Sequence, residues 1–188
     1  MEAENSFYDK LYRKSLVYNL NDVKKSPYYK IYIKIIKYIT DDERILDIGC
    51  GTGQFSDVAI IFNKKYTMGI DFSGIAIKIA KERTNRDTFL VGNIKDKNVY
   101  PDDNEYDVAV LCEVLEHMLD DKIVIHNIPI GKHIILTVPN YNSASHVRIF
   151  KDKNDVIKWY NDDIKVINID TVVVNKKNII FILNGIRK

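Results

Sequence analysis

A short stretch near residue 50 combines a carboxylate with closely spaced glycines. Asp47 lies inside an apolar, strand-like run, and Gly49, Gly51 and Gly53 follow at alternate positions before a helix-like segment. Glycine has no Cβ and tolerates positive φ, so such a loop lets the backbone approach a ligand closely. A helix start adds free N–H groups and the positive end of a dipole. The stretch therefore predicts a site for a nucleotide-like ligand.

The glycine spacing distinguishes two kinds of nucleotide site. The dinucleotide fingerprint has its third glycine five residues after the first, and here Gln54 occupies that position. The third glycine comes one residue early, at Gly53, and Asp47 precedes the loop inside the strand. A plain strand–turn–helix connection has no need of this combination, because interior glycines and a buried carboxylate are both costly without a ligand.

A second group of residues that could take part in catalysis or metal binding lies just after residue 112. Glu113, Glu116 and His117 are spaced so that a helix would place them on one face. Three interpretations remain open for this group. His117 is a general base held by a carboxylate, the three residues bind a divalent ion such as Mg²⁺, or they form a structural helix start beside the ligand pocket.

His146 is the second candidate for acid–base chemistry. It follows the fifth predicted strand and is either a base or ligand across the pocket or a structural residue. The N-terminal segment, which is rich in tyrosine, either caps the same pocket or packs in the core. The two cysteines, Cys50 and Cys112, do not make a disulfide framework, so we expect a reduced, cytoplasmic setting.

Alternating strands and helices must position these residues. Apolar runs predict strands at 44–48, 66–70, 88–91, 106–111 and 132–138. Helical spacing predicts helices at 7–39, 55–62, 74–84, 113–127 and in part of 144–161. Runs at 164–174 and 178–183 flank a polar turn and predict a terminal hairpin. The pattern indicates an α/β fold in one domain, 1–188, with cap helices at 1–40 and a core at 41–188.

Composition limits the classes of partner. The 188 residues are 46% apolar and 29% charged, as in a globular protein, and the net charge of +2 gives no strong case for nucleic acid binding. We find no apolar run of membrane-spanning length, so no membrane association is expected. A small-molecule partner is the simplest expectation, and the oligomeric state stays open.

The stretch Arg44-Ile45-Leu46-Asp47-Ile48-Gly49-Cys50-Gly51-Thr52-Gly53-Gln54-Phe55 resembles the first motif of the class I methyltransferases, which use S-adenosylmethionine (SAM). In that family an acid at the position of Asp47 faces the cationic amino-acid part of SAM, and the loop from Gly49 through Cys50 and Gly51 to Gly53 lines the cofactor. The resemblance implies a Rossmann-like sheet of seven mostly parallel strands, with helices on both faces. Its seventh strand is antiparallel, lies near one edge and belongs to the C-terminal hairpin.

Two further segments match later cofactor motifs of the family. Gly69-Ile70-Asp71-Phe72-Ser73 is similar to the second motif, which implies that Asp71 binds the ribose hydroxyls and Phe72 packs on adenine. Asn93 stands where many members have an acid, and its amide oxygen can accept the same hydrogen bond from the adenine amino group. Ile94 would add a backbone N–H and an apolar wall. Cys112, at the end of the fourth predicted strand, is also expected to contact the cofactor.

Glu113-x-x-Glu116-His117 resembles the metal-associated motif of ubiquinone-biosynthesis O-methyltransferases and of certain RNA 2′-O-methyltransferases. The leading hypothesis is a SAM-dependent O-methyltransferase for a small metabolite, in which His117 or His146 assists deprotonation. One alternative is a metal-dependent RNA 2′-O-methyltransferase, and another is a non-catalytic SAM-binding subunit. The acceptor, and whether O, N or C is methylated, stay open.

Overall fold

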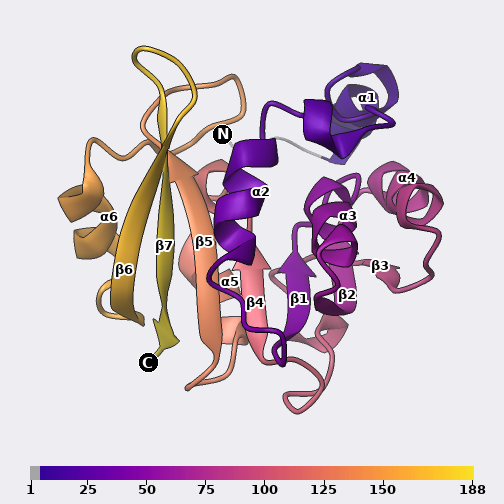
Figure 1. Cartoon of the computed structure of the whole chain (residues 1–188). Helices are drawn as coiled ribbons and strands as arrows, with labels where there is room; N and C mark the ends of the chain where they lie inside the picture. The colour runs from indigo at the N-terminus through magenta and orange to yellow at the C-terminus, as the bar shows by residue number, and fades with distance from the viewer. Residues whose placement is uncertain (1–4) are drawn as a thin grey trace.

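A seven-stranded sheet forms the centre of the part of the chain that this computed structural model describes, which is residues 5–188 without the side chains of Asn5 and Thr67 (Figure 1). Neighbouring strands follow the order β3-β2-β1-β4-β5-β7-β6. Their bounds are β1 (Arg44–Ile48), β2 (Lys65–Asp71), β3 (Phe89–Val91), β4 (Val108–Leu111), β5 (His133–Pro139), β6 (Ile164–Val173) and β7 (Ile179–Arg187).

Strand direction confirms the expected topology. β1 to β5 pair in parallel, whereas β7 runs antiparallel to both β5 and β6. The carboxyl ends of β1, β2, β4 and β5 therefore meet at one edge of the sheet, which is the upper edge in Figure 1. Ligands of open α/β sheets bind beyond this edge.

Helices cover both faces of the sheet because its strands are apolar on both sides. On β1, Ile45 packs with α2 (Tyr29–Ile36) and α3 (Gln54–Ile61), while the adjacent Leu46 packs with α5 (Asp121–Asn127) and α6 (Lys153–Tyr160) on the other face. A third cluster joins α4 (Gly74–Thr84) to β3. The predicted helix 55–62 is confirmed as α3, and the helix expected within 144–161 is α6.

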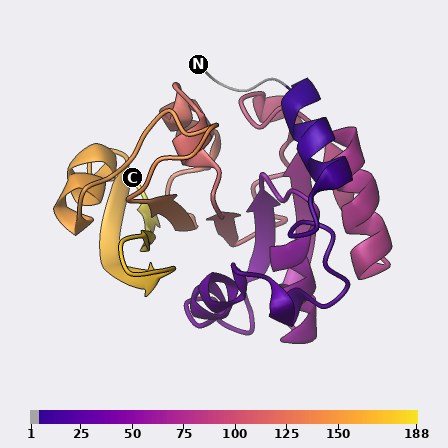
Figure 2. The ribbon, with the colours of Figure 1, turned by 90° about the horizontal axis from the view of Figure 1, so that it is seen from above.

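The prediction of a helix over 7–39 is wrong in its middle. α1 (Asn5–Lys14) and α2 are separated by turns and a single 3₁₀ turn at Val23–Lys25. Polar side chains compete with helical hydrogen bonds there, since the Asn19 amide donates to the carbonyl oxygen of Tyr12 and Asp22 accepts from the backbone of Lys24. Figure 2 shows α1 beside α4, at the end of the sheet where the cap was expected.

The prediction of a helix over 113–127 is also wrong in its first half. Glu113 has a left-handed backbone with φ of +58°, a 3₁₀ turn follows at Leu115–His117, and α5 begins only at Asp121. The Thr137 hydroxyl accepts from the Glu113 N–H and donates to its carboxylate, which holds this sharp exit from β4. Glu113, Glu116 and His117 therefore do not share one helix face.

Within residues 5–188, each helix is too short or too polar to cross a lipid bilayer.

Candidate functional site

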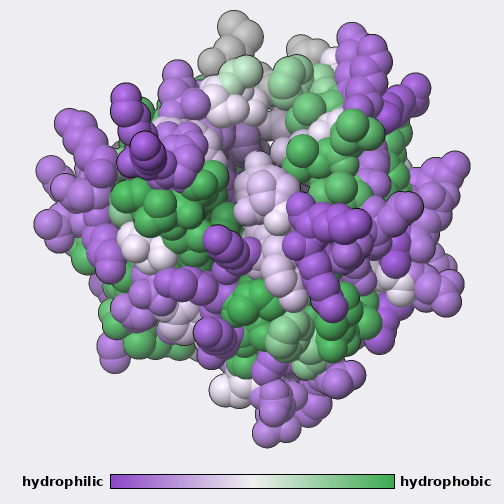
Figure 3. Space-filling view, turned by 45° about the horizontal axis from the view of Figure 1, so that its top comes forward, coloured by the Kyte–Doolittle hydropathy of each residue, from purple (hydrophilic) through white to green (hydrophobic). Residues whose placement is uncertain are grey.

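Two adjoining cavities lie beyond the carboxyl ends of β1, β2 and β4. We call the one of about 480 Å³ the Asp71 cavity and the one of about 330 Å³ the Asp47 cavity, after an acid that lines each. Figure 3 shows the molecule hollowed near the top of that view, which brings this edge forward. The cavities share five lining residues, namely Tyr8, Tyr12, Gly49, Glu113 and His117. One extended ligand can therefore occupy both.

The Asp71 cavity gathers four of the predicted cofactor residues: Asp71, Phe72, Asn93 and Ile94. The Asp71 carboxylate accepts from the backbone N–H groups of Gly51 and Ser73, both at 2.9 Å. Burial raises its pKa to about 6 despite these bonds. Its position is thus fixed by the glycine loop and by the start of α4, where Ser73 is the N-cap.

The Asp47 cavity contains the predicted residues Asp47, Cys50, Gly51 and Cys112. Asp47 is almost fully buried on β1 and accepts a 2.7 Å hydrogen bond from the Ser56 hydroxyl. Burial raises the pKa of Asp47 to about 7. A cation in this cavity would hold the carboxylate in its ionised form.

The glycines of the loop have different tasks. A Cβ on Gly49, whose φ is +74°, would lie 2.6 Å from a Val114 methyl at the junction of the two cavities. Gly53 lines neither cavity, and a Cβ there would lie 2.9 Å from the Cβ of Ala80 on α4. Gly49 therefore lets the loop pack against the turn after β4, whereas Gly53 lets α3 pack against α4.

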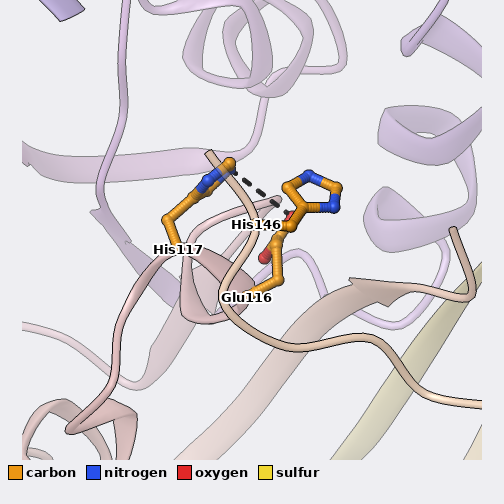
Figure 4. Close-up of side chains that lie close together, drawn as sticks. All are labelled: Glu116, His117 and His146. Carbon is orange, nitrogen blue, oxygen red and sulfur yellow. Dashed lines mark ion pairs between the residues drawn. The ribbon is translucent and has the colours of Figure 1, made fainter. Parts of the chain in front are cut away.

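The structure brings His117 and His146 together although 28 residues separate them. Their ring centroids are 4.9 Å apart, and Figure 4 shows both rings beside the Glu116 carboxylate. The backbone N–H groups of Val147 and Arg148 donate to the Glu116 carbonyl oxygen, which holds the loop after β5 against the 3₁₀ turn. His146 lies in this loop, outside any helix.

Each imidazole is fixed through one nitrogen. Nδ1 of His117 lies 3.0 Å from the Ser145 carbonyl oxygen, and Nδ1 of His146 lies 3.0 Å from that of Tyr141. A carbonyl oxygen only accepts, so this geometry assigns the proton to Nδ1 and leaves the Nε2 lone pair available. Burial lowers the pKa of His117 to about 4 and also lowers that of His146, which keeps both rings neutral at pH 7.

Glu116 is a fully buried acid whose carboxylate oxygens have no hydrogen-bond partner among the described residues. One of them lies 3.8 Å from Nε2 of His117. Burial, and secondly the charge of Glu113, raise the pKa of Glu116 well above its usual value. A buried acid without a hydrogen-bond partner is costly, so its presence indicates that the carboxyl group holds a proton or binds a ligand.

The same side chains have a donor set that suits a divalent ion. Ligand atoms of Glu116, His117 and His146 all lie within 4.8 Å of one another. One carboxylate and two imidazoles held through Nδ1 are a common combination for transition metals. Within residues 5–188, Glu113 is outside this group, so His146 takes its place in the set of three candidate ligands expected from the sequence.

Sequence reasoning missed several residues that shape the site. Tyr141 and Ser145 line the Asp47 cavity, Thr137 fixes Glu113, and Arg83 holds the segment before α2. Tyr141 comes two residues after the end of β5, so the sequence itself indicated that it lies near the carboxyl ends of the strands. Arg83 offered no signal, because its partners are backbone carbonyl groups far along the chain.

Known proteins share this fold and parts of this sequence. The ribosomal protein L11 methyltransferase of Ruminiclostridium cellulolyticum is 32% identical over 92 residues, which cover 47% of this chain and 29% of that protein. The chain thus spans less than a third of that curated relative.

Solved structures extend the likeness to nearly the whole chain. Magnesium protoporphyrin IX methyltransferase from Synechocystis PCC 6803, with bound S-adenosylhomocysteine (SAH), has a TM-score of 0.74 at 13% identity and covers 98% of this chain and 99% of its own. The N-methyltransferase NodS from Bradyrhizobium japonicum, also with SAH, has a TM-score of 0.69 at 17% identity, with 98% and 99% covered. Identities this low show the fold alone.

Strand order and the glycine loop together define a Rossmann-like protein of the class I methyltransferase type. The family model described as "Methyltransferase domain" matches residues 39–178, well over half of the chain. The chain therefore belongs to this family of SAM-dependent methyltransferases.

Proposed function

We propose that SAM binds across both cavities, with its adenosine in the Asp71 cavity and its methionine part in the Asp47 cavity. Asp71 would accept from the ribose hydroxyls, and Phe72 and Ile94 would flank the adenine near Asn93. Asp47 would face the ammonium group. The presence of an acid in each cavity, and the residues that line both cavities, support this orientation.

The reaction that the site supports best is methyl transfer to a hydroxyl oxygen of a small molecule. The observation that carries it is the pair of neutral imidazoles, His117 and His146, which line the Asp47 cavity and have free Nε2 lone pairs. An acceptor oxygen attacks the SAM methyl carbon, the O–C bond forms and the C–S bond breaks. The acceptor proton passes to an Nε2, and SAH leaves.

The lining of the Asp47 cavity favours an acceptor without anionic groups. It contains six tyrosines and two carboxylic acids, but no lysine or arginine among the described residues. A phosphate buried there would lose its hydration without gaining an opposite charge. Tyrosine rings and hydroxyls instead suit a ring-bearing, hydroxylated molecule. This composition gives no support to an RNA acceptor.

Calorimetry with SAM tests the cofactor assignment directly. We expect binding by the wild-type chain and at least a tenfold loss of affinity in Asp71→Ala, because two ribose hydroxyls lose their acceptor. Binding that survives this change would contradict the proposed orientation. Binding without turnover of any hydroxylated acceptor would favour a non-catalytic SAM-binding subunit.

The role of the histidines is tested by turnover with saturating SAM. His117→Ala and His146→Ala should each lower kcat by about 10²–10⁴ if that ring is the base, with SAM affinity retained. His126→Ala, at a half-exposed histidine that lines neither cavity, is the matched control. Equal effects of all three variants would contradict a role of the imidazoles in proton transfer.

A metal-assisted form of the same reaction is the second candidate. Glu116, His117 and His146 would hold a divalent ion, and the orphaned Glu116 carboxylate is the observation that favours it. Such an ion would supply a Lewis acid for the acceptor oxygen. Titration of the chain with Mn²⁺ or Mg²⁺ tests this: binding should be lost in His146→Ala but retained in His126→Ala, a half-exposed histidine paired with Asp163.

A further inference from the structure

The Arg83 side chain, on the last turn of α4, joins three points of the backbone. Its Nε donates to the carbonyl oxygen of Thr52 at 2.9 Å, Nη1 donates to that of Leu20 at 2.7 Å, and Nη2 donates to that of Tyr18 at 2.9 Å. Thr52 belongs to the glycine loop. Tyr18 and Leu20 belong to the connection between α1 and α2, residues 15–28, which we call the cap segment. The forked guanidinium suits such multiple contacts, and lysine cannot reproduce them.

Other hydrogen bonds join the same two parts. The Thr52 hydroxyl donates to the Tyr18 carbonyl oxygen at 2.8 Å, and the buried Gln54 amide donates to that of Val17 at 2.7 Å. The Ser26 hydroxyl donates to the Gln54 amide oxygen at 2.7 Å. The cap segment thus rests on the glycine loop and the start of α3 through several independent contacts.

The cap segment provides part of the wall of the Asp47 cavity. Tyr18 and Tyr28 line this cavity, and the ring of Tyr18 meets that of Tyr12 edge to face at 5.3 Å. Tyr12 lines both cavities, and its hydroxyl would lie 3.5 Å from a Cβ placed on Gly51. The position of the cap segment therefore sets the space above the loop in which methyl transfer is proposed.

We propose that Arg83 is a positioning residue that couples occupancy of the glycine loop to the placement of the cap segment. A bound cofactor fixes the loop and with it the Thr52 carbonyl group. Arg83 then fixes Tyr18 and Leu20, so the tyrosine wall on the acceptor side is completed after the cofactor has bound. The inference rests on the proposed use of SAM, and it implies that the acceptor binds second.

Amide hydrogen exchange of the full chain, with and without SAH, tests this coupling. In the wild type, SAH should slow exchange at the glycine loop and also across residues 15–28, by roughly 5- to 150-fold as is usual for coupled sites. In Arg83→Gln, SAH should still slow exchange at the loop but slow it much less across the cap segment, where only the contacts of Thr52 and Gln54 remain. Because coupling is reciprocal, SAH affinity should fall by the same factor.

Two further variants keep the test sharp. Arg83→Lys keeps the positive charge but not the fork, so it should give a partial loss of cap protection even if Arg83→Gln folds poorly. Lys78→Gln, on the exposed side of the same helix, should behave as the wild type. Equal protection of the cap segment from exchange in the wild type and both Arg83 variants, with SAH bound, would overturn the role of Arg83 but not the proposed function. Failure of the wild type to bind SAH would overturn the proposed function as well.

Discussion

Asp47 lowers the stability of the ligand-free chain whenever it is ionised. Its pKa rises from 3.8 in the unfolded chain to about 7 in the fold, so the folded state retains a proton that the unfolded state has lost between these pH values. Stability therefore falls as pH rises through this window. Above it the cost reaches about 4 kcal/mol at most.

Asp47→Asn should therefore stabilise the protein. Asparagine keeps an acceptor for Ser56 and carries no charge, so we expect Tm to rise by roughly 5–15 °C at pH 8 and the gain to vanish near pH 4. Scanning calorimetry at both pH values measures this. Asp103→Asn, at an exposed turn, should leave Tm unchanged, and a lower Tm for Asp47→Asn at pH 8 would contradict the argument.

The same pKa values predict how SAM binding depends on pH. If the ionised acids bind the cofactor, affinity should begin to fall below about pH 7 as Asp47 is protonated, and fall more steeply below about pH 6 as Asp71 follows. Below its pKa, each of these carboxylates should lower the SAM affinity by about tenfold per pH unit. Calorimetry from pH 5 to 8 measures the curve, and Asp47→Asn should remove its upper part. A flat profile would show that neither carboxylate contacts the cofactor.

At the level of elements, the glycine loop and the turn after β4 depend on each other. Gly49→Ala should destabilise the fold by about 1–3 kcal/mol, because the new Cβ meets Val114 and the backbone has positive φ. Gly131→Ala has a similar φ but open space around it, so its cost is that of the backbone alone. Denaturant unfolding of both variants separates the clash from the backbone strain. Equal costs would exclude a steric role for Val114.

Sequence reasoning found β4 and β5 because they are nearly continuous apolar runs, and β6 and β7 because they flank a polar turn. It failed at Glu113, where a contact with Thr137 of a neighbouring strand imposes a left-handed backbone that no local pattern signals. It likewise named His117 and His146 separately. Their meeting depends on the path of the loop after β5, which is fixed by hydrogen bonds to the Glu116 carbonyl group.

At the scale of the whole molecule, the last strand lies inside the sheet. β7 pairs with β5 on one side and β6 on the other, and Ile180, Ile182 and Leu183 are fully buried. Deletion of residues 179–188 should therefore leave β6 without a partner and abolish cooperative folding, as seen by circular dichroism and thermal melting. Deletion of the exposed Lys188 alone is the control. A cooperative melt of the longer truncation would contradict this view of the sheet.

The shared lining of the two cavities also bears on how the protein can be inhibited. A compound that links an adenosine group to a hydroxylated ring by a short chain would occupy both cavities and pass the glycine loop between them. It would contact two recognition surfaces, but the entropic cost of association would arise only once because the two groups are linked. Selectivity over other adenosine-binding proteins would then come from the tyrosine wall contributed by residues far from the nucleotide motifs.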